Sequence, residues 1–286
     1  MPRRPILVVA TLAALAGAVL FWDLLPALLR HGSPDAEIDF RRWKNRTLYR
    51  FGFDLPGTPR LDDLSGRLAA HGLKLGAPIF MRVFKREFEL EMWLQKDGRF
   101  EHFATYPICR WSGTLGPKLR TGDKQAPEGV YTVGAGQLNP QSRWHRSFDL
   151  GFPNVFDRAH GRSGSFLMVH GGCSSVGCYA MTNAVIDEIW TLVEAALKGG
   201  QPRFQVQVMP FRLSEASLAG ASGPAAPAAA AFWRQLKPAY DLFESSHVPP
   251  RVRVCRGQYV FEAGAKNADG SSPVEAGCGA DKGSRS

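Results

Sequence analysis

Hydrophobic and polar residues alternate through the middle of this chain, and this two-residue period predicts β-strands. The alternation runs through 79–83 and 88–94. A Lys-Asp-Gly-Arg turn at 96–99 then leads into a further strand that ends near Cys109. Shorter extended runs follow at 130–133, 166–170, 203–208 and within 248–261. The pattern therefore predicts a mainly β, α+β fold that begins with an antiparallel hairpin.

One long helix is expected after the loop that follows the 166–170 strand. Thr182 or Asn183 is placed to cap its start, and Gly199-Gly200 is placed to end it. Hydrophobic residues recur inside it at helical spacing, at Val185, Ile189, Val193 and Leu197.

Composition divides the rest of the chain into segments. Residues 134–164 show little periodicity and many aromatic and basic side chains, which favours a long loop that walls a cleft. A helical candidate at 61–71 interrupts a polar lead-in. The predicted organisation is an export segment at 1–30, a lead-in at 31–77, a catalytic domain at 78–212, an Ala/Gly/Pro-rich linker at 213–231, a helix and strand packed on the catalytic domain at 232–263, and a disordered tail at 264–286.

The first thirty residues have the pattern of an export signal. Arg3 and Arg4 precede an apolar run at 6–22 that carries no charge, and small residues within it suit a signal peptidase. The run is at the lower edge of what spans a bilayer, so cleavage and retention as a membrane-anchoring helix both fit it. Basic residues before the run predict that the remainder is exported to the periplasm or cell envelope. A buried core helix is the alternative interpretation.

The chain has 35 Lys+Arg against 26 Asp+Glu and a formal net charge of +9. The basic residues are scattered, so the charge fits an anionic partner only loosely and does not choose among nucleic acid, phospholipid and wall polymers. No nucleic-acid-binding motif is present, and we expect no nucleic-acid partner.

Five cysteines in an exported chain leave at least one thiol without an intramolecular partner. Cys173 and Cys178 lie with His170 and three glycines in the nine residues His-Gly-Gly-Cys-Ser-Ser-Val-Gly-Cys. An ordinary thiol is only about 3% ionised at pH 7, so a nucleophilic cysteine needs a nearby base such as His170. Gly177 lets the backbone turn sharply before Cys178 and expose amides to an oxyanion.

This segment resembles the signature of the YkuD-type L,D-transpeptidases, a His-Gly pair followed by Ser-x-Gly-Cys. Here these are His170-Gly171 and 175–178. The subgroup typified by YafK is most similar, because it shares the short spacing from His to Cys and the Gly-Cys-Tyr-Ala-Met context at 177–181. The resemblance extends over about 80–209, with supporting stretches at 106–109, 116–118, 126–129, 157–162 and 164–166.

The resemblance implies a β-rich domain that acts on peptidoglycan stem peptides during cell wall biogenesis, without metal or organic cofactor. Cys178 would attack the carbonyl of diaminopimelate and form a thioester, and His170 would take and return the proton. The Gly171 carbonyl would orient the imidazole, the amides near Gly177 and Cys178 would bind the oxyanion, and Ser175 would contact substrate. An acceptor amine would then give a cross-link, whereas water would give hydrolysis or release of a wall-linked lipoprotein.

Two positions depart from the family pattern. Most members have a His before the Gly-Cys pair and an Arg two residues after the Cys, whereas this chain has Val176 and Ala180. A substrate-carboxylate role for that arginine would have to move elsewhere. Arg158 and Arg162 are the candidates.

Other interpretations stay open at the level of sequence. Cys173 and Cys178 could form a disulfide, and Cys173 could instead pair with Cys109, Cys255 or Cys278. His170, Cys173 and Cys178 could also ligate zinc together with His145 or His160. The chain could finally be a wall-binding domain without catalysis.

Overall fold

The computed structural model describes residues 35–221 and 226–278 of the 286-residue chain. The chain divides into two units at Leu55. The first contains α2 (Ala36–Arg50), whose side chains pair along the helix in the Arg41–Glu37 and Arg42–Asp39 ion pairs. This helix was not predicted within the polar lead-in, and the predicted export segment at 1–30 lies outside the described residues. Within the described ranges, no helix has the length and apolar character needed to cross a bilayer.

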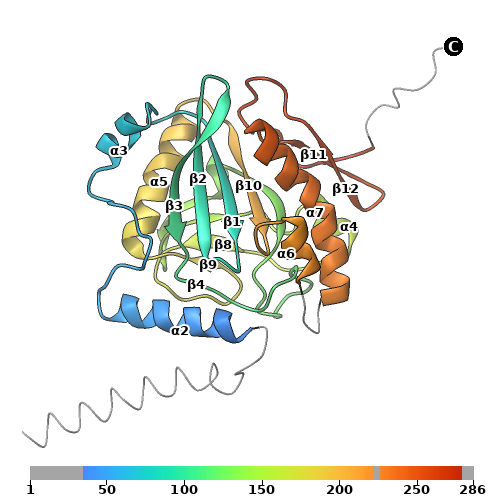
Figure 1. Cartoon of the computed structure of the whole chain (residues 1–286), viewed down its shortest axis with the longest axis horizontal. Coiled ribbons are helices and arrows are strands. Elements are labelled where there is room, and N and C mark those ends of the chain that lie inside the picture. Colours follow the sequence, from blue (N-terminus) through green and yellow to red (C-terminus); the bar gives the residue numbers. More distant parts are fainter. Residues whose placement is uncertain (1–34, 222–225, 279–286) are drawn as a thin grey trace, which may run out of the picture. The chain divides into compact units, whose positions relative to one another are not determined.

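The second unit is built on a five-stranded mixed sheet, here called sheet A (Figure 1). Its order is β3 (Arg99–Pro107), β2 (Glu89–Lys96), β1 (Ile79–Phe84), β10 (Arg203–Met209) and β5 (Gly129–Gly134). Strands β1 and β10 are parallel, and the other pairs are antiparallel. The predicted hairpin and the later strands of this sheet are therefore confirmed.

Helix α7 (Ala226–Ser246) covers one face of sheet A. Phe80 of β1 packs on Phe243 with ring centroids 4.3 Å apart, and two residues further Arg82 pairs with Glu244. Met81, which points to the other face, is also fully buried. Both faces of β1 are thus covered, which explains its nearly continuous run of hydrophobic residues.

A second five-stranded sheet, sheet B, contains His170, and the Gly177-Cys178 pair directly precedes one of its strands. Its order is β4 (Arg110–Trp111), β9 (Tyr179–Ala180), β8 (Met168–His170), β7 (His145–Asp149) and β6 (Leu138–Ser142). The predicted loop at 134–164 is therefore wrong, because this segment contains β6, β7 and α4 (Val155–Ala159). The register of β6 with β7 shifts between Asn139 and Ser142, and this irregularity hides the two-residue period in the sequence.

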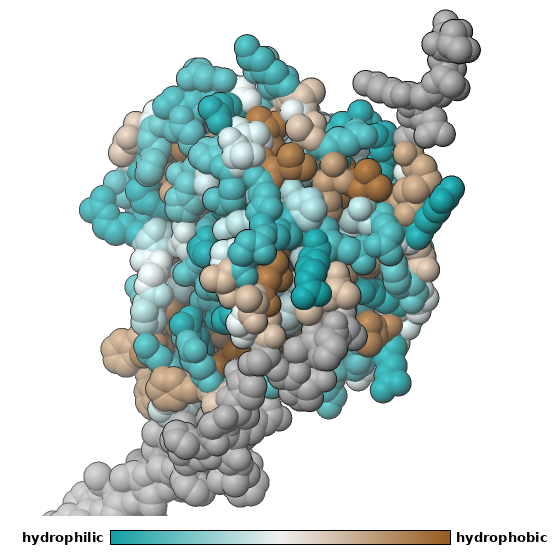
Figure 2. Space-filling model, turned by 45° about the vertical axis from the view of Figure 1, so that its right-hand side comes forward, coloured by the Kyte–Doolittle hydropathy of each residue, from teal (hydrophilic) through white to brown (hydrophobic). Residues whose placement is uncertain are grey.

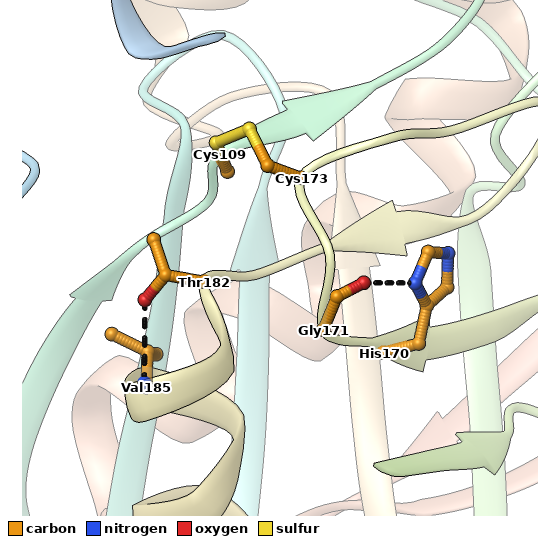
Figure 3. Close-up of a disulfide and its surroundings, with 6 residues drawn as sticks. All are labelled: Cys109, His170, Gly171, Cys173, Thr182 and Val185. Carbon is orange, nitrogen blue, oxygen red and sulfur yellow. Dashed lines mark hydrogen bonds between the residues drawn. A yellow bond between two sulfur atoms is a disulfide. The ribbon is translucent and has the colours of Figure 1, made fainter. Parts of the chain in front are cut away.

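The long helix after the cysteine loop is confirmed as α5 (Asn183–Lys198). Thr182 caps it, since its Oγ1 accepts the Val185 N–H at 3.3 Å (Figure 3). Its buried face packs beside β7 and β1. Because α5 begins three residues after Ala180 of β9, its packing holds the end of the cysteine loop in place.

The C-terminal segments are more ordered than predicted. The predicted linker at 213–231 contains α6 (Glu215–Ala219) and the start of α7, and the expected helix from 232 begins at Ala226. The predicted strand in 248–261 is a hairpin of β11 (Arg251–Cys255) and β12 (Gln258–Glu262). The tail prediction is also wrong for 264–278, because β13 (Glu275–Ala276) pairs with β11 and Cys278 is bonded to Cys255. Leu213 and Ala229 are buried in the α7 core, which a flexible linker would not allow.

A buried ion pair fixes the segment 112–128, which connects β4 to β5. Lys85 and Glu128 are both 0% exposed, and Lys85 Nζ lies 2.9 Å from Glu128 Oε1. Lys85 also donates to the carbonyls of Thr114, Gly116 and Ala126. The second Glu128 oxygen accepts the Trp233 indole N–H at 2.8 Å. The segment is thereby attached to both sheet A and α7.

Replacement of Lys85 by Met is expected to lower the free energy of unfolding by about 3–5 kcal/mol, because the Glu128 carboxylate would stay buried without its cation. Lys198→Met is the control, since Lys198 is exposed and pairs with Glu194 one helical turn away; its expected cost is below about 0.5 kcal/mol. Urea unfolding at pH 7 measures both. Equal costs for the two variants would contradict this account.

Candidate active site

The disulfide pattern leaves one thiol free. Cys109 pairs with Cys173, and Cys255 pairs with Cys278. Cys178 is the free cysteine, and it is half-buried one residue before β9. The alternative Cys173–Cys178 disulfide is therefore wrong. The zinc interpretation loses the Cys173 ligand for the same reason, and no three His, Cys, Asp or Glu side chains converge as a metal site among the described residues.

His170 lies at the end of β8 with its ring held in one orientation. The Nδ1 atom is 2.6 Å from the Gly171 carbonyl oxygen (Figure 3). A carbonyl only accepts, so Nδ1 carries the proton and Nε2 of the neutral ring is the basic nitrogen. The resemblance to the family implied such a contact for the Gly171 carbonyl.

Parallel pairing of β8 with β9 brings the thiol near this ring. His170 lies opposite Ala180 in the register, so Cys178, two residues earlier, lies beside Met168. The Met168 N–H donates to Cys178 Sγ at 3.4 Å, and the thiol donates to the Phe166 carbonyl at 3.6 Å. No hydrogen bond joins the imidazole to the sulfur in the part of the chain that the structure describes. The S–H must therefore leave the Phe166 carbonyl before its proton can pass to the imidazole.

Glycine is required at two positions of the connecting loop. A Cβ on Gly171 would lie 2.7 Å from Asn183 Oδ1 and 3.1 Å from the Trp144 carbonyl oxygen, so a side chain would displace the start of α5. Gly177 has φ of +115°, in the region that favours glycine. The backbone of this loop is thus closely packed at its start and turns sharply at its end.

Two serine hydroxyls accept hydrogen bonds from the backbone of the cysteine loop. Ser112 Oγ accepts the Gly177 N–H at 2.5 Å, and Ser175 Oγ accepts the Cys178 N–H at 3.1 Å. Ser175 also donates to the Cys178 carbonyl at 2.6 Å and lies 3.2 Å from Ser112 Oγ. The predicted oxyanion hole does not match this geometry, because both amides already have acceptors. The substrate-contacting role predicted for Ser175 stays a prediction, and in this structure its buried hydroxyl is bonded to the loop backbone.

The two arginines predicted to replace the missing family arginine are each engaged by other groups. Arg162 is paired with Asp157 at 2.8 Å, and its side chain is 7% exposed. Arg158 donates to the Pro153 carbonyl and lines a small cavity of about 150 Å³ with Val274. The cation whose charge acts on Cys178 is Lys118, which lies in the stretch 116–118 that resembles the family. Lys118 does not stand out in the sequence, because it lies in a polar loop and pairs with Asp123 five residues later.

Electrostatics favour a neutral thiol beside a neutral imidazole. Burial raises the pKa of the Cys178 thiol, and the Asp149 charge raises it further, whereas the Met168 amide and Lys118 lower it. Burial lowers the pKa of His170 below its ordinary value, with the Gly171 carbonyl acting in the opposite direction. Both directions oppose a thiolate–imidazolium pair. The role expected of His170 is therefore that of a base during attack, not that of a partner to a thiolate formed beforehand.

Exposed hydrophobic side chains flank the thiol. Phe166, whose carbonyl accepts a hydrogen bond from the thiol, is 70% exposed, and Val176 is 73% exposed. The Trp144 ring lies 6.0 Å from the His170 ring, measured between centroids, and a Cβ on Gly172 would lie 3.2 Å from it. The face shown in Figure 2 is mostly hydrophilic with scattered hydrophobic areas. Phe148, by contrast, is fully buried and packs on Phe204.

We expect the rate of Cys178 alkylation by iodoacetamide to rise with a midpoint above the ordinary thiol value of about pH 8.5. The sign follows from burial, which raises the thiol pKa, so that the reactive thiolate appears only at higher pH. Quantitative mass spectrometry of the labelled peptide, with a short cysteine peptide as the reference, measures the profile. A rate plateau that extends below pH 7 would instead indicate a preformed ion pair.

The Cys109–Cys173 disulfide is expected to stabilise the fold and the site together. It closes a span of 64 residues, against 23 for Cys255–Cys278, so the loop-entropy relation predicts losses of about 4 and about 3 kcal/mol when each pair is replaced by serines. Only loss of Cys109–Cys173 should also speed Cys178 alkylation at pH 7, because the loosened loop would expose the thiol. Unchanged alkylation in that variant would show that the disulfide does not position the loop.

Comparison with known proteins identifies the family of this chain. The model of the YkuD L,D-transpeptidase catalytic domain matches residues 89–208. YafK of Escherichia coli K12, provisionally named an L,D-transpeptidase, is 45% identical over 186 residues, which are 65% of this chain and 74% of YafK. Among solved structures, the helical cell shape determining protein Pgp2 of Campylobacter jejuni aligns with a TM-score of 0.38 and 19% identity over 64% of this chain and 66% of that chain. The family model and the identity with YafK show that this chain belongs to the YkuD family of L,D-transpeptidases.

Proposed function

We propose that this protein transfers acyl groups of peptidoglycan stem peptides through a thioester on Cys178. The observation that carries the proposal is the free thiol one residue before β9, the strand that pairs with the strand of His170. The Gly171 carbonyl orients the His170 ring so that Nε2 is the basic nitrogen. The family supports a peptidoglycan-related role. A site in the cell envelope follows from such a substrate, with membrane attachment through the N-terminal segment as a further proposal.

In the first half-reaction, His170 Nε2 takes the proton of the thiol as the sulfur attacks the carbonyl of diaminopimelate. The C–N bond of the donor then breaks, the leaving amine takes the proton from the imidazolium, and a thioester remains on Cys178. The neutral resting pair suits this order, because an unprotonated imidazole is available to accept the proton at pH 7.

In the second half-reaction, an acceptor amine attacks the thioester and His170 takes its extra proton. The C–S bond breaks, the thiol is restored, and a new amide forms between two stem peptides. Water in place of the amine gives hydrolysis by the same steps, and a wall-linked lipoprotein as the donor's leaving group would be released. Transfer and hydrolysis therefore differ only in the acceptor.

Incubation of the purified protein with sacculi, with and without bound lipoprotein, tests this proposal. Analysis of the released muropeptides by liquid chromatography and mass spectrometry reads new cross-links, trimmed stems and freed lipoprotein in one experiment. We expect Cys178→Ala to abolish the products and His170→Ala to lower their rate by about 10²–10⁴-fold. Asp241→Asn on α7, an exposed change, is the matched control.

The distribution of products separates the alternatives. New cross-links support transfer, and trimmed stems or free lipoprotein without cross-links support hydrolysis. Binding of the wild-type protein to sacculi with no product, unchanged in Cys178→Ala, would favour the wall-binding domain without catalysis and would contradict the proposal.

A further inference from the structure

We propose that Asp149 binds an ammonium group of the substrate beside Cys178. This inference rests on the proposed function, in which the donor carries diaminopimelate. The far end of diaminopimelate bears a second amino group, which is a cation at neutral pH when it is not cross-linked. Asp149 would thus select donors whose diaminopimelate side chain is free.

The register of sheet B places Asp149 on the same face as His170. Asp149 of β7 lies opposite Met168 of β8, and Ser147 lies opposite His170. Directly opposed residues share a face of the sheet, as do residues two apart on one strand. Asp149 is therefore the diagonal neighbour of His170, at about 7–8 Å between such positions. It also lies directly across from the residue whose amide donates to the sulfur.

Asp149 has no cation of its own within the described ranges. Its Oδ1 accepts the Gly151 N–H at 2.8 Å, and no Lys, Arg or His pairs with it there. Buried carboxylates elsewhere in the second unit are paired with cations, namely Glu91 with Arg82, Glu128 with Lys85, Asp157 with Arg162, and Glu188 with Arg67. Asp149 is half-buried, and burial raises its pKa, because only the Gly151 amide offsets the desolvation. An unpaired carboxylate at this depth is suited to receive a cation from outside.

The charge of Asp149 couples binding of the substrate ammonium group to the ionisation of the Cys178 thiol. Its negative charge raises the pKa of the Cys178 thiol, and Lys118 is the charged group that acts in the opposite direction. An ammonium group bound to Asp149 would cancel that negative charge. The thiol would then ionise more readily with the donor seated than in the free protein. The charged and titratable groups around the sulfur are accordingly Asp149, Lys118 and His170.

The chemistry of the site favours an ammonium group over a metal ion. A divalent cation needs several ligands, whereas one carboxylate is enough for a compact monovalent cation. In the described part of the chain, no further Asp, Glu, His or Cys completes a cluster with Asp149. An ammonium group has three N–H donors, and one of them is enough to bond the Asp149 oxygen that does not accept the Gly151 N–H.

Charged thiol reagents test the inference without any peptidoglycan substrate. Cys178 is modified by a methanethiosulfonate that carries a trimethylammonium group and by the neutral methyl reagent, and the ratio of the two rates is measured. We expect the ratio to fall by about threefold or more in Asp149→Asn, because the attraction of the cation is lost. Asn keeps the size of Asp and can still accept the Gly151 N–H. Asp241→Asn, a change of the same kind on exposed α7, should leave the ratio unchanged.

The selectivity of the enzyme for its donor peptide tests the proposed role of Asp149 during catalysis. A stem tetrapeptide with a free diaminopimelate amine is compared with the same peptide acetylated at that amine. We expect acetylation to raise KM by about tenfold in the wild type and to have little effect in Asp149→Asn.

The outcomes separate this inference from the proposed function. If neither peptide is consumed by the wild type, the proposed function fails, and the reagent ratio still decides the role of Asp149. A ratio that is the same in the wild type and Asp149→Asn would overturn the inference. Retention of the preference for the free amine in Asp149→Asn would overturn it as well.

Discussion

The position of the thiol depends on the parallel pairing of β8 with β9. This pairing sets Cys178 beside Met168 and two residues from the level of His170. The proposed base therefore ends one strand, and the proposed nucleophile directly precedes its neighbour. The short loop between them is fixed by the Cys109–Cys173 disulfide and by the hydroxyls of Ser112 and Ser175. Ser112 belongs to the segment 112–128, which the buried Lys85–Glu128 pair holds in place. The position of the cysteine loop therefore depends on contacts with sheet A and α7.

The same packing determines the protonation of the site. Burial removes water from both the thiol and the imidazole, and each group then favours its neutral form. A neutral thiol held against the Phe166 carbonyl is protected from oxidation, since the thiolate is the reactive species. In the proposed reaction the thiol would therefore ionise as it attacks, with His170 as the proposed base. Charges supplied by the substrate can then change the reactivity of the sulfur.

Sequence predicted much of this fold because its strongest patterns are local. The alternation in β1 and β2, the spacing in α5 and the His-Gly and Gly-Cys signature each depend on neighbouring residues. The segment 134–164 was wrongly predicted to be a loop, because β6 and β7 are short and polar and their pairing contains a register shift. Asp149, Lys118 and Ser112 were missed because their importance comes from partners distant in the chain. The amides at Gly177 and Cys178 likewise looked free, since nothing local reveals that serine hydroxyls occupy them.

The central claim is that the Cys178 sulfur becomes covalently acylated with His170 as its base. Intact-protein mass spectrometry after brief incubation with a stem tetrapeptide and an acid quench tests it most directly. The account predicts a mass increase equal to the acyl part of the donor, mapped to the Cys178 peptide, and its slow formation in His170→Ala. Products formed without such an adduct, or an adduct that forms equally fast in His170→Ala, would contradict it.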